Sequence, residues 1–525
     1  FSEAVTVTGT PQLTLETGSS DAVVNYSSGS GGTTLTFNYT VASGNTSSDL
    51  DYASTGALAL NSGTIRDAAG NNATLTLASP GASNSLGNNK ALIVDTTVPT
   101  LSSSSPADGA TSVGVNANIV LTFSETVVAG SGNILISTGS SSDGGFESIP
   151  VGNAKVSISS NVVTINPAGT FASSTAYNVQ VPATAFDDAA GNSYAGITNA
   201  TTLNFTSADV VAPTVLSVSS TTANGAYKVG DEILITITFS ENVYVNYDNG
   251  RPRLTFETGS YDQQRNYTSG SGGTVLTWTY IVASGNTSSD LDVQSTTALA
   301  LNGGTMKDAA GNDAVLTLPE PGSSNSLSAN KNIVIDTTVP TVSSVTSTTA
   351  NGSYNAADVI AVTVIFSEAV TVFVSGGVYP QLTLETGSSD AVVYYSSGTG
   401  GTTLTFNYTV ASGHTSSDLD YAGPSALALN SGTINDAAGN AATRTLPSTG
   451  ATNSLGANKA LVVDGVVPAT PTGLTAADGN TTITLTWTAS DESNALNEGF
   501  EGESLPTNWT TVNDMPTGVG ELSGA

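Results

Sequence analysis

The sequence predicts an all-β protein built from tandem β-sandwiches. Three observations support this prediction: a repeat along the chain, strand-like alternation of apolar and polar residues inside each repeat, and no sustained helical stripe with caps. The chain has 525 residues, which is far too long for one hydrophobic core. We therefore expect about three to five domains.

The repeat is defined by short motifs that recur in the same order. FSEAVTV begins at Phe1 and again at Phe366, and FSENVYV begins at Phe239, so the last two copies are 366 − 239 = 127 residues apart. SSDLD and DAAGN recur in the same three copies. Each DAAGN is followed by an aspartate 28 residues later, as in 95 − 67 = 28. A divergent unit between the first and second of these copies keeps only FSE and DAAGN.

Prolines that follow extended linkers mark the boundaries between the units. An X-Pro step holds the preceding residue in an extended conformation, and proline cannot donate a hydrogen bond to a sheet. Four such steps divide the chain into five segments. We predict a sandwich that lacks its first strands (1–98), a divergent sandwich (99–211), two complete sandwiches (212–338 and 339–466) and a partial segment (467–525).

Inside a unit the hydrophobic pattern has the period of a β-strand. Val359–Phe366 and Thr403–Val410 alternate or run apolar and are rich in β-branched and aromatic residues. Gly/Ser-rich stretches such as Ser396–Gly401 separate the strands as hairpin loops. About seven short strands per unit are typical of an immunoglobulin-like sandwich. Tandem copies of such a sandwich predict an elongated rod.

These motifs resemble those of the bacterial immunoglobulin-like repeats of large surface adhesins. The resemblance rests on FSE near the second strand, on DAAGN late in the unit and on the linker VDTTVPT at Val94–Thr100. The divergent unit is similar to a related subtype in surface-layer proteins, so the resemblance covers residues 1–467. It implies a secreted protein on the bacterial cell surface.

The C-terminal segment departs from the repeat. Thr470–Ser490 is similar to the first two strands of a fibronectin type III module, and Glu498–Asp514 resembles the opening of a jelly-roll domain. The chain ends too early to complete either one.

The charge balance limits the classes of partner. The formal net charge is −31, from 42 acidic and 11 basic residues. Nucleic-acid binding needs a basic face, so we expect no nucleic-acid partner. An acidic surface suits solubility by self-repulsion, or the binding of hard cations such as calcium. No apolar run approaches the ~20 residues of a membrane-spanning helix, and no signal peptide is recognisable.

The residues needed for catalysis are also missing. The sequence has no cysteine, which excludes disulfides and thiol chemistry. Its one histidine, His414, lies in a loop where other copies have Asn45 and Asn286, and no G-x-S-x-G motif occurs. The carboxylates recur with the repeat, as structural features do. We therefore expect no enzyme.

Placing the motifs on a seven-strand sandwich brings acidic residues to both ends of each unit. FSE follows strand B and DAAGN lies between strands F and G, at the N-terminal end. SSDLD lies between strands E and F, at the C-terminal end, where the aspartate after strand G also lies. Facing acidic loops would supply calcium with oxygen ligands, an arrangement that resembles the calcium-stiffened rods of cadherins. The candidate ligands are Asp49, Asp51, Asp95, Glu125 and Asp188 at the first junction, and Asp290, Asp292, Asp336, Glu368 and Asp436 between the third and fourth sandwiches.

A second explanation of the acidic loops stays open at this point. Aspartate and asparagine in loops commonly bond their own backbone in Asx turns. DAAGN is then a tight turn whose glycine supplies a positive φ.

The first copy starts at its FSE motif. The complete copies carry 26 residues between the hinge proline and FSE (239 − 213 = 26; 366 − 340 = 26). Strand A and most of strand B are therefore missing, which leaves a strand edge open. Two explanations stay open: the chain is a piece of a longer protein, or a neighbour donates strands. Thr470–Ser490 offers two strands for such a head-to-tail assembly.

The sequence as a whole predicts a structural stalk or fibre segment of a bacterial adhesin or extracellular filament. Its partners would be further copies of itself or neighbouring domains of a longer chain, with a surface glycan or protein as ligand. The alternative is a set of accessory carbohydrate- or surface-binding modules of a larger secreted enzyme. Aromatic residues make up only 6% of the chain and its three tryptophans do not recur between repeats, which favours the structural role.

Overall fold

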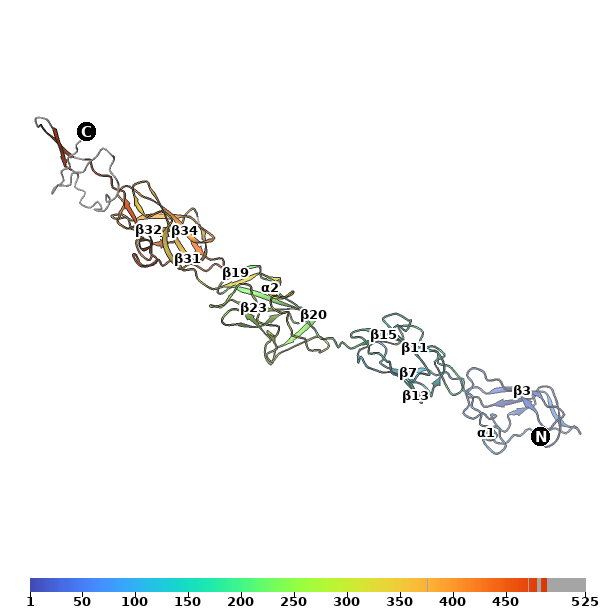
Figure 1. The fold of residues 1–525 in the computed structure, drawn as a ribbon. Coiled ribbons are helices and arrows are strands. Elements are labelled where there is room, and N and C mark those ends of the chain that lie inside the picture. Colours follow the sequence, from blue (N-terminus) through green and yellow to red (C-terminus); the bar gives the residue numbers. More distant parts are fainter. Residues whose placement is uncertain (375, 471, 479–482, 489–525) are drawn as a thin grey trace. The chain divides into compact units, whose positions relative to one another are not determined.

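The computed structural model describes residues 1–374, 376–470, 472–478 and 483–488. Within these residues the chain is almost entirely β, with three helices of four residues each, which confirms the all-β prediction. The chain divides into two compact units, residues 1–212 with 310–312 and residues 213–309 with 313–525. We number the four predicted sandwiches 1 to 4 in chain order. The first unit contains sandwiches 1 and 2, and the second contains sandwiches 3 and 4 (Figure 1). The predicted jelly-roll opening, Glu498–Asp514, lies outside the described residues.

Sandwich 2, which follows Pro99, has the strand order of an immunoglobulin-like fold. One sheet runs β13-β14-β9-β7 and the other runs β12-β11-β15-β17-β8. β8 is parallel to β17, and the other neighbours in these two sheets are antiparallel. The strands are β7 (Leu101–Ser105), β8 (Ala110–Val113), β9 (Ile119–Phe123), β10 (Val128–Ala129), β11 (Asn133–Thr138), β12 (Glu147–Pro150), β13 (Val156–Ser159), β14 (Val162–Ile165), β15 (Ala176–Gln180), β16 (Phe186–Asp187) and β17 (Asn204–Ser207).

The core of sandwich 2 follows from the period of its strands. Successive side chains of a strand point to opposite faces of the sheet. In β9, Ile119, Leu121 and Phe123 are buried and the residues between them are half-buried. The inward side chains of both sheets form one buried hydrophobic cluster.

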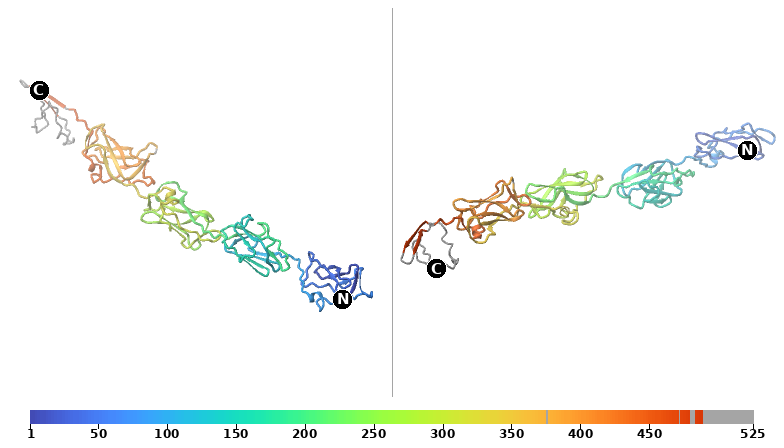
Figure 2. Two further views of the ribbon diagram at one scale, coloured as in Figure 1. Left: turned by 45° about the vertical axis from the view of Figure 1, so that its right-hand side comes forward. Right: turned by 90° about the horizontal axis from the view of Figure 1, so that it is seen from above.

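Sandwiches 3 and 4 share a second version of this fold. In sandwich 3 a large sheet runs β18-β20-β23-β22-β21-β25, and a small sheet runs β19-β28-β24. In sandwich 4 the corresponding orders are β29-β31-β34-β33-β32-β36 and β30-β38-β35. β19 is parallel to β28, and β30 is parallel to β38. In both views of Figure 2 the strands of each sandwich gather into a body of their own.

The bounds of the elements in these two sandwiches correspond closely. Sandwich 3 has β18 (Val215–Ser220), β19 (Gly225–Tyr227), β20 (Glu232–Asn246), β21 (Arg253–Glu257), β22 (Gln263–Ser269), β23 (Gly273–Ile281), β24 (Thr287–Ser288), β25 (Asp292–Val293), β26 (Leu299–Ala300), β27 (Thr305–Lys307), α2 (Leu327–Asn330) and β28 (Ile333–Asp336). Sandwich 4 has β29 (Val342–Ser347), β30 (Gly352–Tyr354), β31 (Val359–Phe373), β32 (Gln381–Leu384), β33 (Ala391–Ser397), β34 (Gly401–Thr409), β35 (Thr415–Ser416), β36 (Leu427–Ala428), β37 (Thr433–Asn435), α3 (Leu455–Asn458) and β38 (Leu461–Asp464).

The FSE motif lies inside a long strand in both of these sandwiches. β31 has 15 residues; its first half pairs with β34, and its second half pairs with β37. The register against β34 shifts between Ile365 and Val370, which places Glu368 where the strand changes partner. Such irregularities redirect side chains. The sequence prediction placed the motif after strand B, as in sandwich 2, and did not foresee this continuation.

Sandwich 1 contains the later strands of the same fold. Its two sheets run β1-β6 and β4-β3-β2-β5. β4 has two residues, whereas its counterpart β34 in sandwich 4 has nine, because β34 pairs along the first half of β31 and sandwich 1 has no such strand. The elements are β1 (Val5–Thr8), β2 (Gln12–Leu15), β3 (Ala22–Ser28), β4 (Thr36–Phe37), β5 (Leu58–Ala59), β6 (Thr64–Asp67) and α1 (Leu86–Asn89).

The C-terminal segment contributes one strand pair. β39 (Thr472–Asp478) and β40 (Ile483–Thr488) are antiparallel and form a two-stranded sheet. The sequence analysis offered these two strands to a neighbouring copy; in the structure they pair with each other. Within the described residues, no helix is long and apolar enough to cross a membrane.

Candidate metal centre

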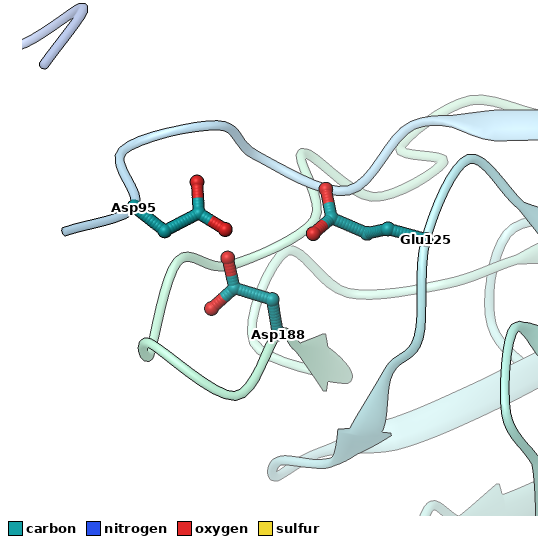
Figure 3. Close-up of side chains that lie close together, drawn as sticks. All are labelled: Asp95, Glu125 and Asp188. Atoms are coloured by element: carbon teal, nitrogen blue, oxygen red, sulfur yellow. The ribbon is translucent and has the colours of Figure 1, made fainter. Parts of the chain in front are cut away.

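Three carboxylates from separate segments meet where sandwich 1 joins sandwich 2. Asp95 lies in the linker, Glu125 follows β9, and Asp188 begins the turn after β16. One oxygen of each carboxylate lies within 4.8 Å of the others. Figure 3 shows the three side chains pointing toward one another. The sequence analysis named all three as candidate ligands.

The DAAGN turn fixes the position of Asp188. Its Oδ1 accepts hydrogen bonds from the backbone N–H groups of Ala190 and Asn192, both at 2.8 Å. The side chain of Asn192 donates from Nδ2 to Asp188 Oδ2 at 2.7 Å. Gly191 has φ +90°, a conformation that favours glycine. The Asx-turn explanation therefore holds for the backbone of this loop.

The same asparagine also holds the linker. Asn192 Nδ2 donates to the carbonyl oxygen of Asp95 at 2.9 Å. The side chain of Asp95 accepts a hydrogen bond at Oδ1 from the backbone N–H of Thr97 at 2.8 Å. One amide group therefore joins the DAAGN turn of sandwich 2 to the linker aspartate. The sequence analysis did not name Asn192, although its place at the end of a repeated motif could have identified it.

The electrostatics of the cluster differ between its members. Burial, and then the charges of Asp95 and Asp188, raise the pKa of Glu125. Burial alone would also raise the pKa of Asp188, but the hydrogen bonds from Asn192 and from the backbone of the turn outweigh it and lower the pKa. The turn therefore keeps Asp188 ionised, and the neighbouring negative charges make ionisation of Glu125 less favourable.

A second cluster with the same composition lies between sandwiches 3 and 4. Asp336, Glu368 and Asp436 each have an oxygen within 4.8 Å of the others. Asn440 Nδ2 donates to Asp436 Oδ2 at 2.8 Å and to the carbonyl oxygen of Asp336 at 2.9 Å. Burial, and then the charges of Asp336 and Asp436, raise the pKa of Glu368. Both contacts of the Asn192 amide in the first cluster therefore recur at Asn440.

The aspartates of SSDLD take a different place from the one predicted. Asp51 is buried and accepts from the backbone N–H groups of Gly81 at 2.9 Å and Leu86 at 3.2 Å. A Cβ at Gly87, in α1, would meet Asp51 Oδ2 at 3.2 Å and Asp49 Oδ2 at 3.3 Å. Both aspartates therefore face the start of the short helix in their own sandwich.

The equivalent pair in sandwich 3 behaves in the same way. Asp292 Oδ2 accepts from the hydroxyl of Ser328 at 2.6 Å, and Asp290 Oδ1 accepts from the backbone N–H of Ile333 at 3.3 Å. Ile333 begins β28 and Asp336 ends it. At ~3.3 Å per residue, the contact of Asp290 with Ile333 therefore lies about 10 Å from Asp336, the aspartate of the junction cluster. The structure does not bring Asp49, Asp51, Asp290 or Asp292 into the three-carboxylate clusters. Asp290 instead bonds the start of β28, and Asp49 bonds the equivalent backbone at Leu92.

One family model matches part of the chain. Residues 95–207 match the bacterial Ig-like domain family, a range that includes all three residues of the first cluster. No curated protein sequence matches the chain.

Several solved structures show a distant likeness. An Escherichia coli adhesin, FdeC, is 12% identical, with a TM-score of 0.26 over 71% of this chain and 100% of that chain. The S-layer protein rSbsC is 11% identical, with a TM-score of 0.15 over 82% of this chain and 63% of that chain. Because these scores are low, the assignment rests on the strand order and the family match. The chain is thus a tandem array of Ig-like sandwiches, of which residues 95–207 match the bacterial Ig-like domain family.

Proposed function

We propose that the chain is a structural stalk or fibre segment of a secreted bacterial surface protein, stiffened by calcium bound between neighbouring sandwiches into an elongated rod. The observation that supports this most directly is the recurrence of the Asp–Glu–Asp cluster at two junctions, each time with an asparagine that bonds the linker. A structural feature is expected to recur in each repeated unit, whereas an active site is expected to occur once.

The chemistry of the clusters favours a hard cation. Calcium takes six to eight oxygen ligands from carboxylates, backbone carbonyls and water. Three carboxylates with oxygens within 4.8 Å of one another repel each other unless a cation or a proton neutralises them. The Asx turn accounts for the position of Asp188, and the bond from Asn192 accounts for the backbone of Asp95. Neither gives a reason for the side chains of Glu125 and Asp95 to face Asp188. Calcium binding gives that reason for all three.

An aromatic sugar-binding platform would favour accessory binding modules instead. Trp278 belongs to the complete sandwich 3, and its side chain is entirely buried. It packs against Tyr267 inside the core and presents no face to a ligand. The structural role is therefore the function that the described residues support best.

The calcium proposal can be tested with two substitutions in the same type of turn. Asp188→Asn removes one carboxylate of the first cluster and disturbs the DAAGN turn. Asp67→Asn disturbs the equivalent turn of sandwich 1, where Asn71 makes the same two bonds to Asp67, at 2.8 and 2.7 Å. Asp67 belongs to neither of the two junction clusters. Calorimetric titration with calcium, and with magnesium as a comparison, would be run on the full chain.

We expect Asp188→Asn to remove one calcium-binding event and Asp67→Asn to leave the number unchanged. A chelator should lower the melting temperature of the unmodified chain and increase its flexibility in solution scattering. If a chelator changes neither property, or if both variants bind as the unmodified chain does, calcium is not the junction ligand.

A further inference from the structure

An open groove lies on the surface of sandwich 4 beside β36. It has a volume of about 500 Å³ and is bounded by the loop before β36 and by the segment that follows the DAAGN turn. Its lining includes Pro424, Ser425, Leu427, Thr443, Arg444 and Thr445. Grooves of this size take small ligands. The structural role proposed above makes no use of it.

Sandwich 4 differs from sandwich 1 at this groove. The two sandwiches have nearly the same sequence over their shared residues, but Pro424, Ser425 and Arg444 stand where sandwich 1 has Thr55, Gly56 and Leu75. Three of the six residues named above therefore differ between two copies that are otherwise mostly identical.

The change from leucine to arginine accounts for the groove. Leu75 of sandwich 1 and the equivalent Leu316 of sandwich 3 are half-buried and pack against the cores of their sandwiches. Arg444 is exposed. An arginine keeps its guanidinium group in water, so it leaves uncovered the part of the core that the leucine covers. Leu427, a member of the core cluster of sandwich 4, lines the groove as a result.

The guanidinium group of Arg444 has donors available for a ligand. Its Nη1 donates to the carbonyl oxygen of Leu427 at 3.4 Å. Among the residues that the structure describes, no carboxylate forms an ion pair with Arg444. A guanidinium group has five N–H donors in a planar fork that matches a carboxylate. Most of these donors can therefore bind an anionic ligand in the groove.

The rest of the groove suits a sugar better than a simple ion. Ser425, Thr443 and Thr445 supply hydroxyl groups, which both donate and accept hydrogen bonds. Pro424 and Leu427 add apolar surface for the C–H groups of a sugar ring. A small inorganic anion would use the arginine and leave these groups without a role.

Backbone contacts hold the two walls of the groove in place before a ligand binds. The N–H of Thr443 donates to the carbonyl oxygen of Pro340 at 2.8 Å, and the N–H of Leu446 donates to that of Pro424 at 2.9 Å. The second contact joins the two walls directly. A groove that is formed in advance needs little ordering when its ligand binds.

We infer that the groove of sandwich 4 binds a sugar that carries a carboxylate, such as a hexuronate residue. The guanidinium group of Arg444 would bind the carboxylate, and the hydroxyl groups of Ser425, Thr443 and Thr445 would bond those of the sugar. The net charge of −31 repels long polyanions and further copies of this acidic chain. The ligand is therefore a single acidic sugar residue.

The test compares methyl glucuronide with methyl glucoside, which has a hydroxymethyl group in place of the carboxylate. Binding to the full chain is measured by calorimetric titration and by saturation-transfer NMR. A chelator is present throughout, because calcium itself binds carboxylates. We expect one equivalent of methyl glucuronide to bind about tenfold or more tightly than methyl glucoside, because hydrogen bonds to a charged group are the stronger ones.

Two substitutions that remove the same charge locate the site. Arg444→Leu introduces the residue that sandwiches 1 and 3 have, so the variant should fold, and it should weaken binding of methyl glucuronide about tenfold or more. Arg66→Leu removes an arginine whose Nε bonds Asn72 in sandwich 1, and it should leave binding unchanged. Arg444→Lys keeps the charge without the planar fork and should bind with intermediate affinity.

Three results would overturn the inference: equal binding of the two sugars, binding of neither, or an Arg444→Leu variant that binds as the unmodified chain does. Equally tight binding of acetate would also overturn it, because the groove would then not recognise the sugar. Self-association of the chain that is lost in Arg444→Leu, measured by sedimentation, would assign the groove to an acidic segment of another copy instead. None of these results bears on the calcium proposal, since the titrations contain no free calcium.

Discussion

Asn192 and Asn440 each join two segments with one amide group. Each donates from Nδ2 to the aspartate side chain of its own turn and to the carbonyl oxygen of the preceding linker aspartate. The linker aspartate is thereby held beside the turn. The position of each three-carboxylate cluster depends on this contact as much as on the carboxylates themselves.

Replacing Asn440 with alanine tests that role. The variant loses the linker bond and one bond to Asp436, whereas Asn71→Ala in sandwich 1 loses the equivalent bond to Asp67 and no linker bond. We expect the junction of Asn440→Ala to be less stable by a further ~0.5–1.5 kcal/mol, the usual net value of one hydrogen bond. Hydrogen exchange of the turn amides measures both variants. Equal losses in the two variants would show that the linker bond contributes nothing.

The response of Glu368 to pH should change sign with calcium. Burial and two neighbouring charges raise the pKa of Glu368 above its ordinary value of 4.5. Its ionised form therefore carries a penalty in the folded chain, fully present above the raised pKa and lost as the pH falls toward 4.5. Without calcium, acidification over this window should stabilise the junction. With calcium, the same protonation should release the ion and destabilise it.

Glu368→Gln provides the check on this pH effect. It should remove the acid stabilisation seen without calcium and weaken calcium binding at neutral pH, because it deletes one charged ligand. Glu385→Gln, an exposed change in the same sandwich, should do neither. Exchange rates of the junction amides between neutral pH and pH 5, with and without chelator, measure the effect. A Glu368→Gln variant with the unmodified pH response would contradict the assignment.

At the scale of single elements, β23 shows how the repeats tolerate different cores. Trp278 in β23 stands opposite Tyr267, and Phe406 in β34 stands opposite Tyr395 in the same register. Both aromatic side chains are fully buried. The indole Nε1 of Trp278 has no hydrogen-bond partner, which is costly for a buried donor. The strand therefore needs a large apolar side chain here and makes no use of the indole N–H.

Substitutions at Trp278 should follow from this arrangement. Trp278→Phe loses contact area but also removes the unpaired N–H, so we expect it to cost less than about 2 kcal/mol. Trp278→Ala leaves a large cavity and should cost about 3–5 kcal/mol. Urea unfolding of sandwich 3 followed by hydrogen exchange compares the two variants. Similar costs for both would show that the indole N–H makes a useful contact.

At the scale of the whole molecule, sandwiches 1 and 4 have nearly the same sequence over their shared residues but differ in the burial of equivalent side chains. The side chains of Val41 and Leu92 are exposed, whereas Val410 and Leu461 are buried. Burial of one such side chain contributes about 1.5–3 kcal/mol. Comparing the two sandwiches therefore measures how much the first strands contribute to the stability of this fold.

We expect sandwich 1 to exchange its amide hydrogens faster than sandwich 4. The amides of residues 33–41 have no strand on one side, whereas those of residues 402–410 lie beside the first half of β31. Hydrogen exchange of the full chain, compared peptide by peptide, measures the difference. Equal protection of the two segments would show that pairing with the first half of β31 does not protect residues 402–410.

The sequence by itself determined the all-β fold, the Ig-like sandwiches and their tandem order. These features depend on local information: the two-residue period of the strands, the glycines and prolines between them, and the recurrence of whole motifs. The same local information predicted that Asp95, Glu125 and Asp188 would meet, because the ends of strands B, F and G lie at known ends of a sandwich.

Only the tertiary structure decided which acidic residues share a cluster. Asp290 and Asp292 are close in sequence to a strand that pairs with the end of β28, but their side chains turn toward its beginning and toward α2. The residue type does not predict which end of a strand a carboxylate will contact, because a carboxylate can accept hydrogen bonds from whichever N–H groups the fold presents. The role of Asn440 depends in the same way on its contact with Asp336, which lies 104 residues earlier in the chain.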